Sequence, residues 1–343
     1  MSPTVCASSL RITFVCLLAL ITRSAFAQTG MDDVHIATRG QSLHDVTVDV
    51  ATTAYDTSSA GGLYGGTVLR SSANLVLVPV SITDALHRPV VGLDLENFRL
   101  FEGKTPQAIK HFSTEDTPVS VGILVDVSGS MSSKLERARE AVLEFCEAAN
   151  PQDEFFMITF ADVPQLVTDF TNRPEQLEND LITARSKGQT SLLDAIYMGV
   201  RKMRNARYGR KALLILSDGG DNHSRYSEKD VKAALKESDV MVYAVGTYER
   251  YASTTEELLG PELLREVAGI TGGEAFSISD VTELPAVTRN IGTQLRHQYL
   301  LAYQPPAAHD GKWRKISVKL RLPKKFNYLL RVDARPGYYG GGE

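Results

Sequence analysis

The chain has 343 residues, of which 43% are hydrophobic and 23% are charged. This is the composition of an ordinary globular protein, and it excludes the collagen-like, disulfide-dense and wholly disordered classes. The 37 basic and 41 acidic side chains give a net charge of −4, so no overall positive field points to nucleic acid or to an anionic membrane surface as a partner. The length allows one large domain or two smaller ones.

The N-terminus has the pattern of a secretory signal. Arg11 precedes a short apolar run over residues 12–21, and an Ala-x-Ala sequence follows at residues 25–27. We therefore expect residues 1–27 to be a signal peptide and the protein to be exported, either periplasmic or secreted. Because no later stretch approaches membrane-spanning length, we expect no membrane span after cleavage; a permanent N-terminal anchor is the alternative. Cleavage would leave Cys146 as the one remaining cysteine, which precludes an intrachain disulfide.

Two short β segments flank the middle of the chain. Residues 28–70 lack apolar periodicity and are rich in small and polar residues, which predicts a flexible linker. Strand patterns such as Phe98–Glu102 then predict an N-terminal β segment over residues 71–116, and Tyr299–Tyr303 begins a second one over residues 298–343. Because the first segment is too short to be a comfortable domain alone, we expect the two to pack together as a small β-sandwich.

Residues 117–297 have a different pattern, in which strands alternate with helices. The predicted buried strands are Val121–Val125, Phe155–Phe160, Ala212–Leu216 and Val240–Val245. This alternation predicts an α/β domain with a doubly wound, mostly parallel sheet of Rossmann-like type, covered on both faces. Cys146 falls on the apolar stripe of the first predicted helix, so we interpret it as a buried structural thiol.

Oxygen-bearing side chains follow the first of these strands. Asp126, Ser128 and Ser130 come directly after Val121–Val125, spaced i, i+2, i+4 around Gly129. The carboxyl ends of parallel strands meet at one edge of a sheet, where ligands bind. Carboxylate and hydroxyl oxygens without a nearby His or Cys suit a hard cation such as Mg²⁺ or Mn²⁺.

Two further segments are expected at the same edge of the sheet. The sequence GQTSLLDA at residues 188–195 precedes a predicted helix, and the strand Ala212–Leu216 ends in SDGG at residues 217–220. With these three segments, DVSGSM, GQTSLLDA and ILSDGGDN, the chain resembles the von Willebrand factor A domain with its metal-ion-dependent adhesion site.

The resemblance implies a site for Mg²⁺ or Mn²⁺. In this sequence the matching positions are Asp126, Ser128 and Ser130 in the first motif, Thr190 in the second and Asp218 in the third. The family pattern implies that the hydroxyls are direct or near-direct ligands and that the two aspartates often act through ordered water. A retained fold with a vacant or purely stabilising site is the alternative.

The flanks resemble a narrower group. The segments around residues 80–107 and the sequences QYLLAY at 298–303 and ARPGYY at 334–339 are similar to the VWFA-related proteins first grouped from acidobacteria. With these pieces the resemblance spans about residues 71–340. It implies an architecture more firmly than an activity.

Our leading hypothesis is a non-enzymatic, extracytoplasmic adhesion module that captures an acidic group of a partner protein through the bound cation. Mostly neutral ligands leave the cation with uncancelled positive charge and an open coordination position for a carboxylate. One alternative is a structural envelope component that binds through its β-sandwich. Another is a metal-dependent hydrolase, which the sequence supports less well because the seven His residues show no metal-binding spacing and no G-x-S-x-G elbow is present.

Four residues beside the predicted ligands have two interpretations each. Asp194 either orients the loop of the site or, at least as plausibly, faces the dipole of the helix that follows. Asp221, Asn222 and His223 either shape a partner surface or are solvated loop residues, and we favour the second interpretation.

Overall fold

The computed structural model describes residues 34–35, 75–218, 220–248, 255–305, 311–322 and 330–340. These residues belong to one compact unit. The predicted signal peptide and nearly all of the predicted linker lie outside the described residues. Within the described ranges, no helix is long and apolar enough to cross a membrane.

A six-stranded sheet forms the centre of the α/β domain. Its strand order is β12-β11-β10-β7-β8-β9, and all neighbours are parallel except the pair β8 and β9. The strands are β7 (Val119–Asp126), β8 (Glu154–Phe160), β9 (Pro164–Thr171), β10 (Arg210–Ser217), β11 (Val240–Thr247) and β12 (Ala275–Ile278). Every residue of β7 is buried, as expected for a central parallel strand covered on both faces. The predicted doubly wound, mostly parallel sheet is confirmed.

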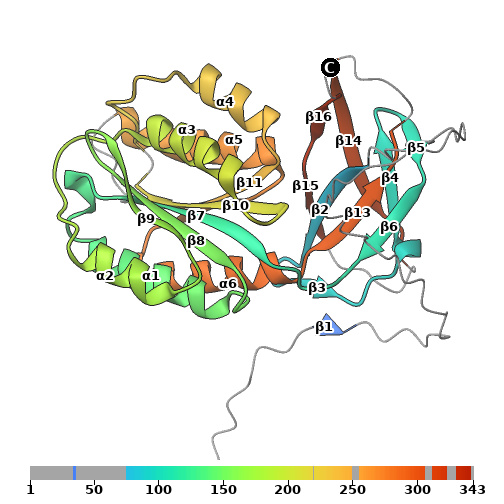
Figure 1. Cartoon of the computed structure of the whole chain (residues 1–343), viewed down its shortest axis with the longest axis horizontal. Helices are drawn as coiled ribbons and strands as arrows, with labels where there is room; N and C mark the ends of the chain where they lie inside the picture. Colours follow the sequence, from blue (N-terminus) through green and yellow to red (C-terminus); the bar gives the residue numbers. More distant parts are fainter. Residues whose placement is uncertain are drawn as a thin grey trace, which may run out of the picture. The chain divides into compact units, whose positions relative to one another are not determined.

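Three helices cover each face of this sheet (Figure 1). One face carries α1 (Leu135–Ala148), α2 (Pro174–Ile182) and α6 (Leu284–Arg296), and the other carries α3 (Leu192–Lys202), α4 (Glu228–Glu237) and α5 (Thr255–Thr271). Four short 3₁₀ helices connect elements: η1 (Leu95–Asn97), η2 (Gly129–Met131), η3 (Met203–Asn205) and η4 (Val281–Glu283). Cys146 is buried on α1, and burial raises the pKa of its thiol to about 12, as expected for a structural thiol.

A glycine allows close packing in the middle of β7. A Cβ atom at Gly122 would lie 2.3 Å from Cζ of Phe156 and 2.6 Å from Cδ2 of Leu213, both on neighbouring strands. The glycine therefore interrupts an otherwise apolar run because large side chains from β8 and β10 occupy the space above it.

The flanking segments form a β-sandwich of two four-stranded sheets, ordered β15-β2-β13-β6 and β16-β14-β4-β5. The strands are β2 (Val76–Thr83), β4 (Phe98–Glu102), β5 (Thr105–Gln107), β6 (Ile109–Ser113), β13 (Tyr299–Tyr303), β14 (Trp313–Leu320), β15 (Arg331–Ala334) and β16 (Gly337–Tyr339). A two-residue strand β1 (Val34–His35) pairs in parallel with β3 (Val90–Val91). Strands from opposite ends of the chain are neighbours: Tyr299 on β13 lies opposite Val80 on β2, and Ile316 on β14 lies opposite Glu102 on β4.

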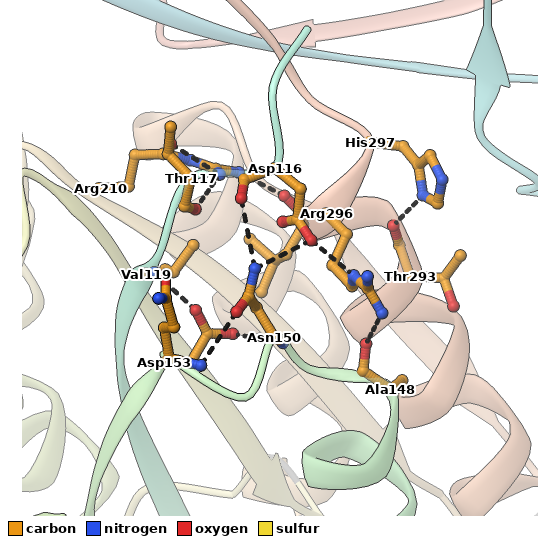
Figure 2. Close-up of polar contacts among 12 residues, drawn as sticks. Asp116, Thr117, Val119, Ala148, Asn150, Asp153, Arg210, Thr293, Arg296 and His297 are labelled. Atoms are coloured by element: carbon orange, nitrogen blue, oxygen red, sulfur yellow. Dashed lines mark hydrogen bonds and ion pairs between the residues drawn. The ribbon is translucent and has the colours of Figure 1, made fainter. Parts of the chain in front are cut away.

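Polar contacts join the places where the chain enters and leaves the α/β domain. Figure 2 shows Asp116, just before β7, between Asn150 and Arg296. Its Oδ2 accepts hydrogen bonds from Nδ2 of Asn150 at 3.1 Å and from Nε of Arg296, the last residue of α6, at 2.9 Å. These contacts lie at the amino end of β7, so Asp126 lies at the other end of the strand from this junction.

Candidate metal site

The first loop of the site is organised by Asp126, the last residue of β7. The side chain of Asp126 is fully buried, its Oδ1 accepts a hydrogen bond from the backbone N–H of Ser128 at 2.8 Å, and its Oδ2 accepts one from the hydroxyl of Ser217 at 2.6 Å. The turn η2 follows, and Oγ of Ser128 lies 3.1 Å from Oγ of Ser130. Ser128 is buried and Ser130 is exposed. The structure therefore gathers the three predicted residues of the first motif into one cluster.

The second loop is attached to the first through its backbone. The N–H of Gly129 donates to the carbonyl oxygen of Gly188 at 3.1 Å. Gly188 has a φ of 85°, and a Cβ there would lie 2.7 Å from the carboxylate oxygens of Asp162. That carboxylate in turn accepts from the N–H of Gln189 at 2.8 Å. Asp162 and the two glycines thus fix the chain immediately before Thr190.

The third loop is tied to the second by Asn222. Oδ1 of Asn222 accepts a hydrogen bond from the backbone N–H of Thr190 at 2.9 Å, and the N–H of Asn222 donates to the carbonyl oxygen of Thr190 at 3.1 Å. Asp218 begins the third loop directly after β10, which is the neighbour of β7 in the sheet. Asn222 is exposed, as we expected for a solvated loop residue, and it also links two of the predicted motif loops.

Asp194 and Asp221 hold the start of α3 against the third loop. Oδ1 of Asp194 accepts hydrogen bonds from the backbone N–H groups of residues 225 and 226, both at 2.9 Å. Oδ1 of Asp221 accepts from the N–H of Leu193 at 3.2 Å and from the hydroxyl of Ser224 at 2.5 Å. The Asp194 carboxylate therefore fixes the third loop, and its place in the first turn of α3 also fits the helix-dipole interpretation.

The site contains two buried carboxylates and a partly buried lysine. Burial, and secondarily the negative charge of Asp218, raises the pKa of Asp126 to about 6. Asp218 is 7% exposed, and its Oδ2 lies 3.5 Å from Nζ of Lys134. The side chain of Lys134 is only 12% exposed. The sequence analysis did not predict a role for Lys134. The one feature that could have indicated it is its position, as a basic residue between the first motif and the apolar stripe of α1.

The donor set is chemically suited to a hard divalent cation. Two carboxylates and three hydroxyls supply oxygen ligands of the kind that Mg²⁺ and Mn²⁺ prefer. Two carboxylates with one compensating lysine leave excess negative charge in a buried place, which a bound cation would relieve. Across the described ranges, no three side chains among His, Cys, Asp and Glu gather as a metal-binding group, so the hydroxyls are an essential part of any such site.

The comparisons with known proteins identify the α/β domain. Residues 120–290 match the family model described as von Willebrand factor type A domain. The chain carries a von Willebrand factor type A (VWA) domain. The predicted domain and its fold are confirmed, while the metal-ion-dependent adhesion site and the acidobacterial-type group stay predictions.

Curated relatives are similar over part of the chain. Inter-alpha-trypsin inhibitor heavy chain H4 from Bos taurus is 28% identical over 140 residues, which cover 36% of this chain and 15% of that protein. The Homo sapiens protein of the same name is 24% identical over 135 residues, covering 34% of this chain and 14% of the relative. The chain therefore matches only a small part of the length of these relatives.

Solved structures are similar at low sequence identity. A von Willebrand factor type A protein from Catenulispora acidiphila has a TM-score of 0.47 at 12% identity, covering 79% of this chain and 74% of that one. The conserved hypothetical protein BatB from Bacteroides thetaiotaomicron has a TM-score of 0.41 at 19% identity, covering 51% of this chain and 98% of that one.

Proposed function

We propose that this protein is an exported, non-enzymatic binding module of the acidobacterial-type VWA-related group, with a metal-ion-dependent adhesion site for Mg²⁺ or Mn²⁺. The proposed metal-binding residues are Asp126, Ser128, Ser130, Thr190 and Asp218. The partner is a protein that supplies a carboxylate. The observation that carries the proposal is the meeting of the three motif loops at one sheet edge, with two buried carboxylates among hydroxyl oxygens.

Each residue has a distinct part in the proposed site. Asp126 organises the first loop, because both of its oxygens accept hydrogen bonds from that loop and from β10. Ser128, Ser130 and Thr190 offer neutral oxygens, which cancel none of a cation's charge. When bound, the cation supplies positive charge and a coordination position for the partner's carboxylate.

Two considerations favour binding over hydrolysis. VWA domains mediate protein–protein interaction and adhesion, and the relatives matched here share that domain. In addition, the carboxylate of Asp126 already accepts two hydrogen bonds at 2.8 and 2.6 Å, which makes it a poor general base.

The first test measures metal binding directly. Mn²⁺ is titrated into the chain from residue 28 onward and into three variants, and free Mn²⁺ is followed by electron paramagnetic resonance. Asp126→Ala and Ser130→Ala should weaken binding strongly. Ser130 is useful because it is exposed, so we expect its substitution to leave the fold intact. Asp169→Ala is the matched control, since the side chain of Asp169 is 69% exposed and pairs with Lys202. Equal binding by all four proteins would contradict the proposed site.

The second test asks whether a partner depends on the metal. The same chain is used as bait on an extracytoplasmic extract in Mg²⁺ and in EDTA, beside Ser130→Ala. A partner captured only by wild type with Mg²⁺ is the expected result.

A second candidate function is binding through the β-sandwich. A cavity of about 620 Å³ is lined in part by Leu77, Trp313 and Tyr339, apolar side chains of the sandwich that are 47%, 36% and 43% exposed. A partner retained by wild type in EDTA and by Ser130→Ala would favour this surface, since contacts between apolar side chains do not depend on a cation.

A further inference from the structure

Lys134 lies inside the candidate metal site and has no part in the predicted ligand set. It immediately precedes α1, and its backbone is held by two hydrogen bonds: its N–H donates to the carbonyl oxygen of Met131 at 2.9 Å, and its carbonyl oxygen accepts from the N–H of Ala138 at 3.0 Å. Its ammonium group lies 3.5 Å from Oδ2 of Asp218 with both side chains nearly buried. The lysine is thus directed from the end of the first loop onto the carboxylate of the third.

The charge of Lys134 affects any cation held by the same loops. Two like charges repel more strongly where water is partly excluded, so the ammonium of the partly buried Lys134 beside Asp218 opposes the binding of a divalent cation. Lys134 also changes the net charge of the site once the cation is bound. With Asp126 and Asp218 ionised, the two charges of the cation would be cancelled by the carboxylates alone, and Lys134 leaves the loaded site with one positive charge.

We propose that Lys134 sets the charge of the cation site. Its positive charge weakens the binding of the divalent cation. The same charge keeps the cation-loaded site positive, so that the loaded site prefers a carboxylate ligand. This inference rests on the proposed function, because it concerns the same cation. It makes Lys134 a positioning and specificity-determining residue, not a ligand. Removing the charge of Lys134 should therefore have two effects of opposite sign: the cation binds more tightly, and the carboxylate binds more weakly.

The substitution Lys134→Met tests the charge while conserving the length of the side chain. Mn²⁺ is titrated at about pH 8, where lysine is charged and carboxylates are ionised. We expect Lys134→Met to bind Mn²⁺ at least about tenfold more tightly than wild type. Acetate is then titrated into the Mn²⁺-loaded proteins and followed by water-proton relaxation, and we expect acetate binding to weaken at least about threefold in the variant.

Two control variants separate charge from packing. Lys202→Met removes a lysine of similar exposure, 18%, that pairs with Asp169 on β9, and it should leave Mn²⁺ and acetate binding unchanged. Lys134→Arg keeps the charge and should stay close to wild type in both titrations. Should Lys134→Met fail to fold by circular dichroism, Lys134→Gln removes the same charge with a polar side chain.

The outcomes distinguish this inference from the proposed function. If wild type binds Mn²⁺ and Lys134→Met binds it equally or more weakly, the role of Lys134 is overturned and the metal site stands. The same holds if acetate binds equally to the two Mn²⁺-loaded proteins. Mn²⁺ binding by Lys134→Met but not by wild type supports the opposing charge of Lys134 and overturns the proposed function. Absence of Mn²⁺ binding from both proteins overturns both.

Discussion

Replacing Asp126 by asparagine should stabilise the metal-free protein, although Asp126 is the first residue of the predicted metal motif. The side chain is completely buried, and its charged form is disfavoured by burial and by the charge of Asp218. Asparagine keeps an acceptor for the N–H of Ser128 and offers its amide to the hydroxyl oxygen of Ser217. The substitution therefore removes a buried charge and conserves the shape of the loop.

The size of the effect follows from the raised pKa. The pKa of Asp126 rises from 3.8 to about 6, so its ionised form costs the folded state about 3 kcal/mol once the pH is above both values. The sign is the reverse of that for a salt-bridged aspartate: the unfolded chain ionises first, so the folded state loses stability as the pH rises from about 4 to about 6. The cost falls to about 1 kcal/mol at about pH 4.5 and disappears below the unfolded pKa.

Thermal unfolding in EDTA measures this difference. At about pH 8, Asp126→Asn should melt about 6–12 °C above wild type, given the usual response of a domain of this size. The gap should shrink at about pH 4.5. In Mg²⁺ the melting temperature of wild type should rise to that of Asp126→Asn or above it, because a bound cation stabilises only the protein that binds it.

The control is Asp169→Asn, at an exposed aspartate whose pKa is lowered, chiefly by its hydrogen bond with Lys202, and it should give no gain in stability. If Asp126→Asn melts below wild type in EDTA at about pH 8, the charge of Asp126 is compensated in the folded protein and our reasoning is refuted.

Three further predictions concern the scaffold of the site. Gly122→Ala should destabilise the protein by about 1–3 kcal/mol in urea unfolding, because its Cβ would meet the ring of Phe156; an unchanged midpoint would contradict the packing argument. Asn222→Ala should weaken Mn²⁺ binding about tenfold by releasing the N–H of Thr190, and binding equal to wild type would show that the link is dispensable. Cys146 should not react with a thiol reagent in the native state at about pH 8, since its pKa is about 12, and should react fully in urea; rapid native labelling would contradict its burial.

The strands of the α/β domain were predictable because burial on both faces leaves a local mark. The apolar run Val121–Val125 lies within β7, and β7 extends beyond it only by Val119, Ser120 and Asp126, which continue the ladder. β9 was not predicted, since it is an edge strand that begins with Pro164 and pairs on one side only. An edge strand buries few side chains, so its sequence has little hydrophobic pattern.

The motif residues were found as three separate clusters of oxygen-bearing side chains at strand ends. The sequence could place Asp126, Thr190 and Asp218 at one edge because parallel strands align their carboxyl ends. It could not predict that Asn222 binds Thr190 or that Lys134 pairs with Asp218, because each contacts a residue of another loop. Such a contact depends on how two loops pack against each other, and the sequence of neither loop predicts which loop it will contact.

By itself, then, the sequence determined the local conformations and the chemical character of one sheet edge, through hydrophobic periodicity and the types of side chain that follow each strand. The tertiary structure decided the pairing of β2 with β13, the link from Asn222 to Thr190 and the ion pair between Lys134 and Asp218. The physical reason is the range of the forces involved. Periodicity is set by neighbours within a few residues, whereas the charge and hydrogen bonding of a buried site are set by distances in space.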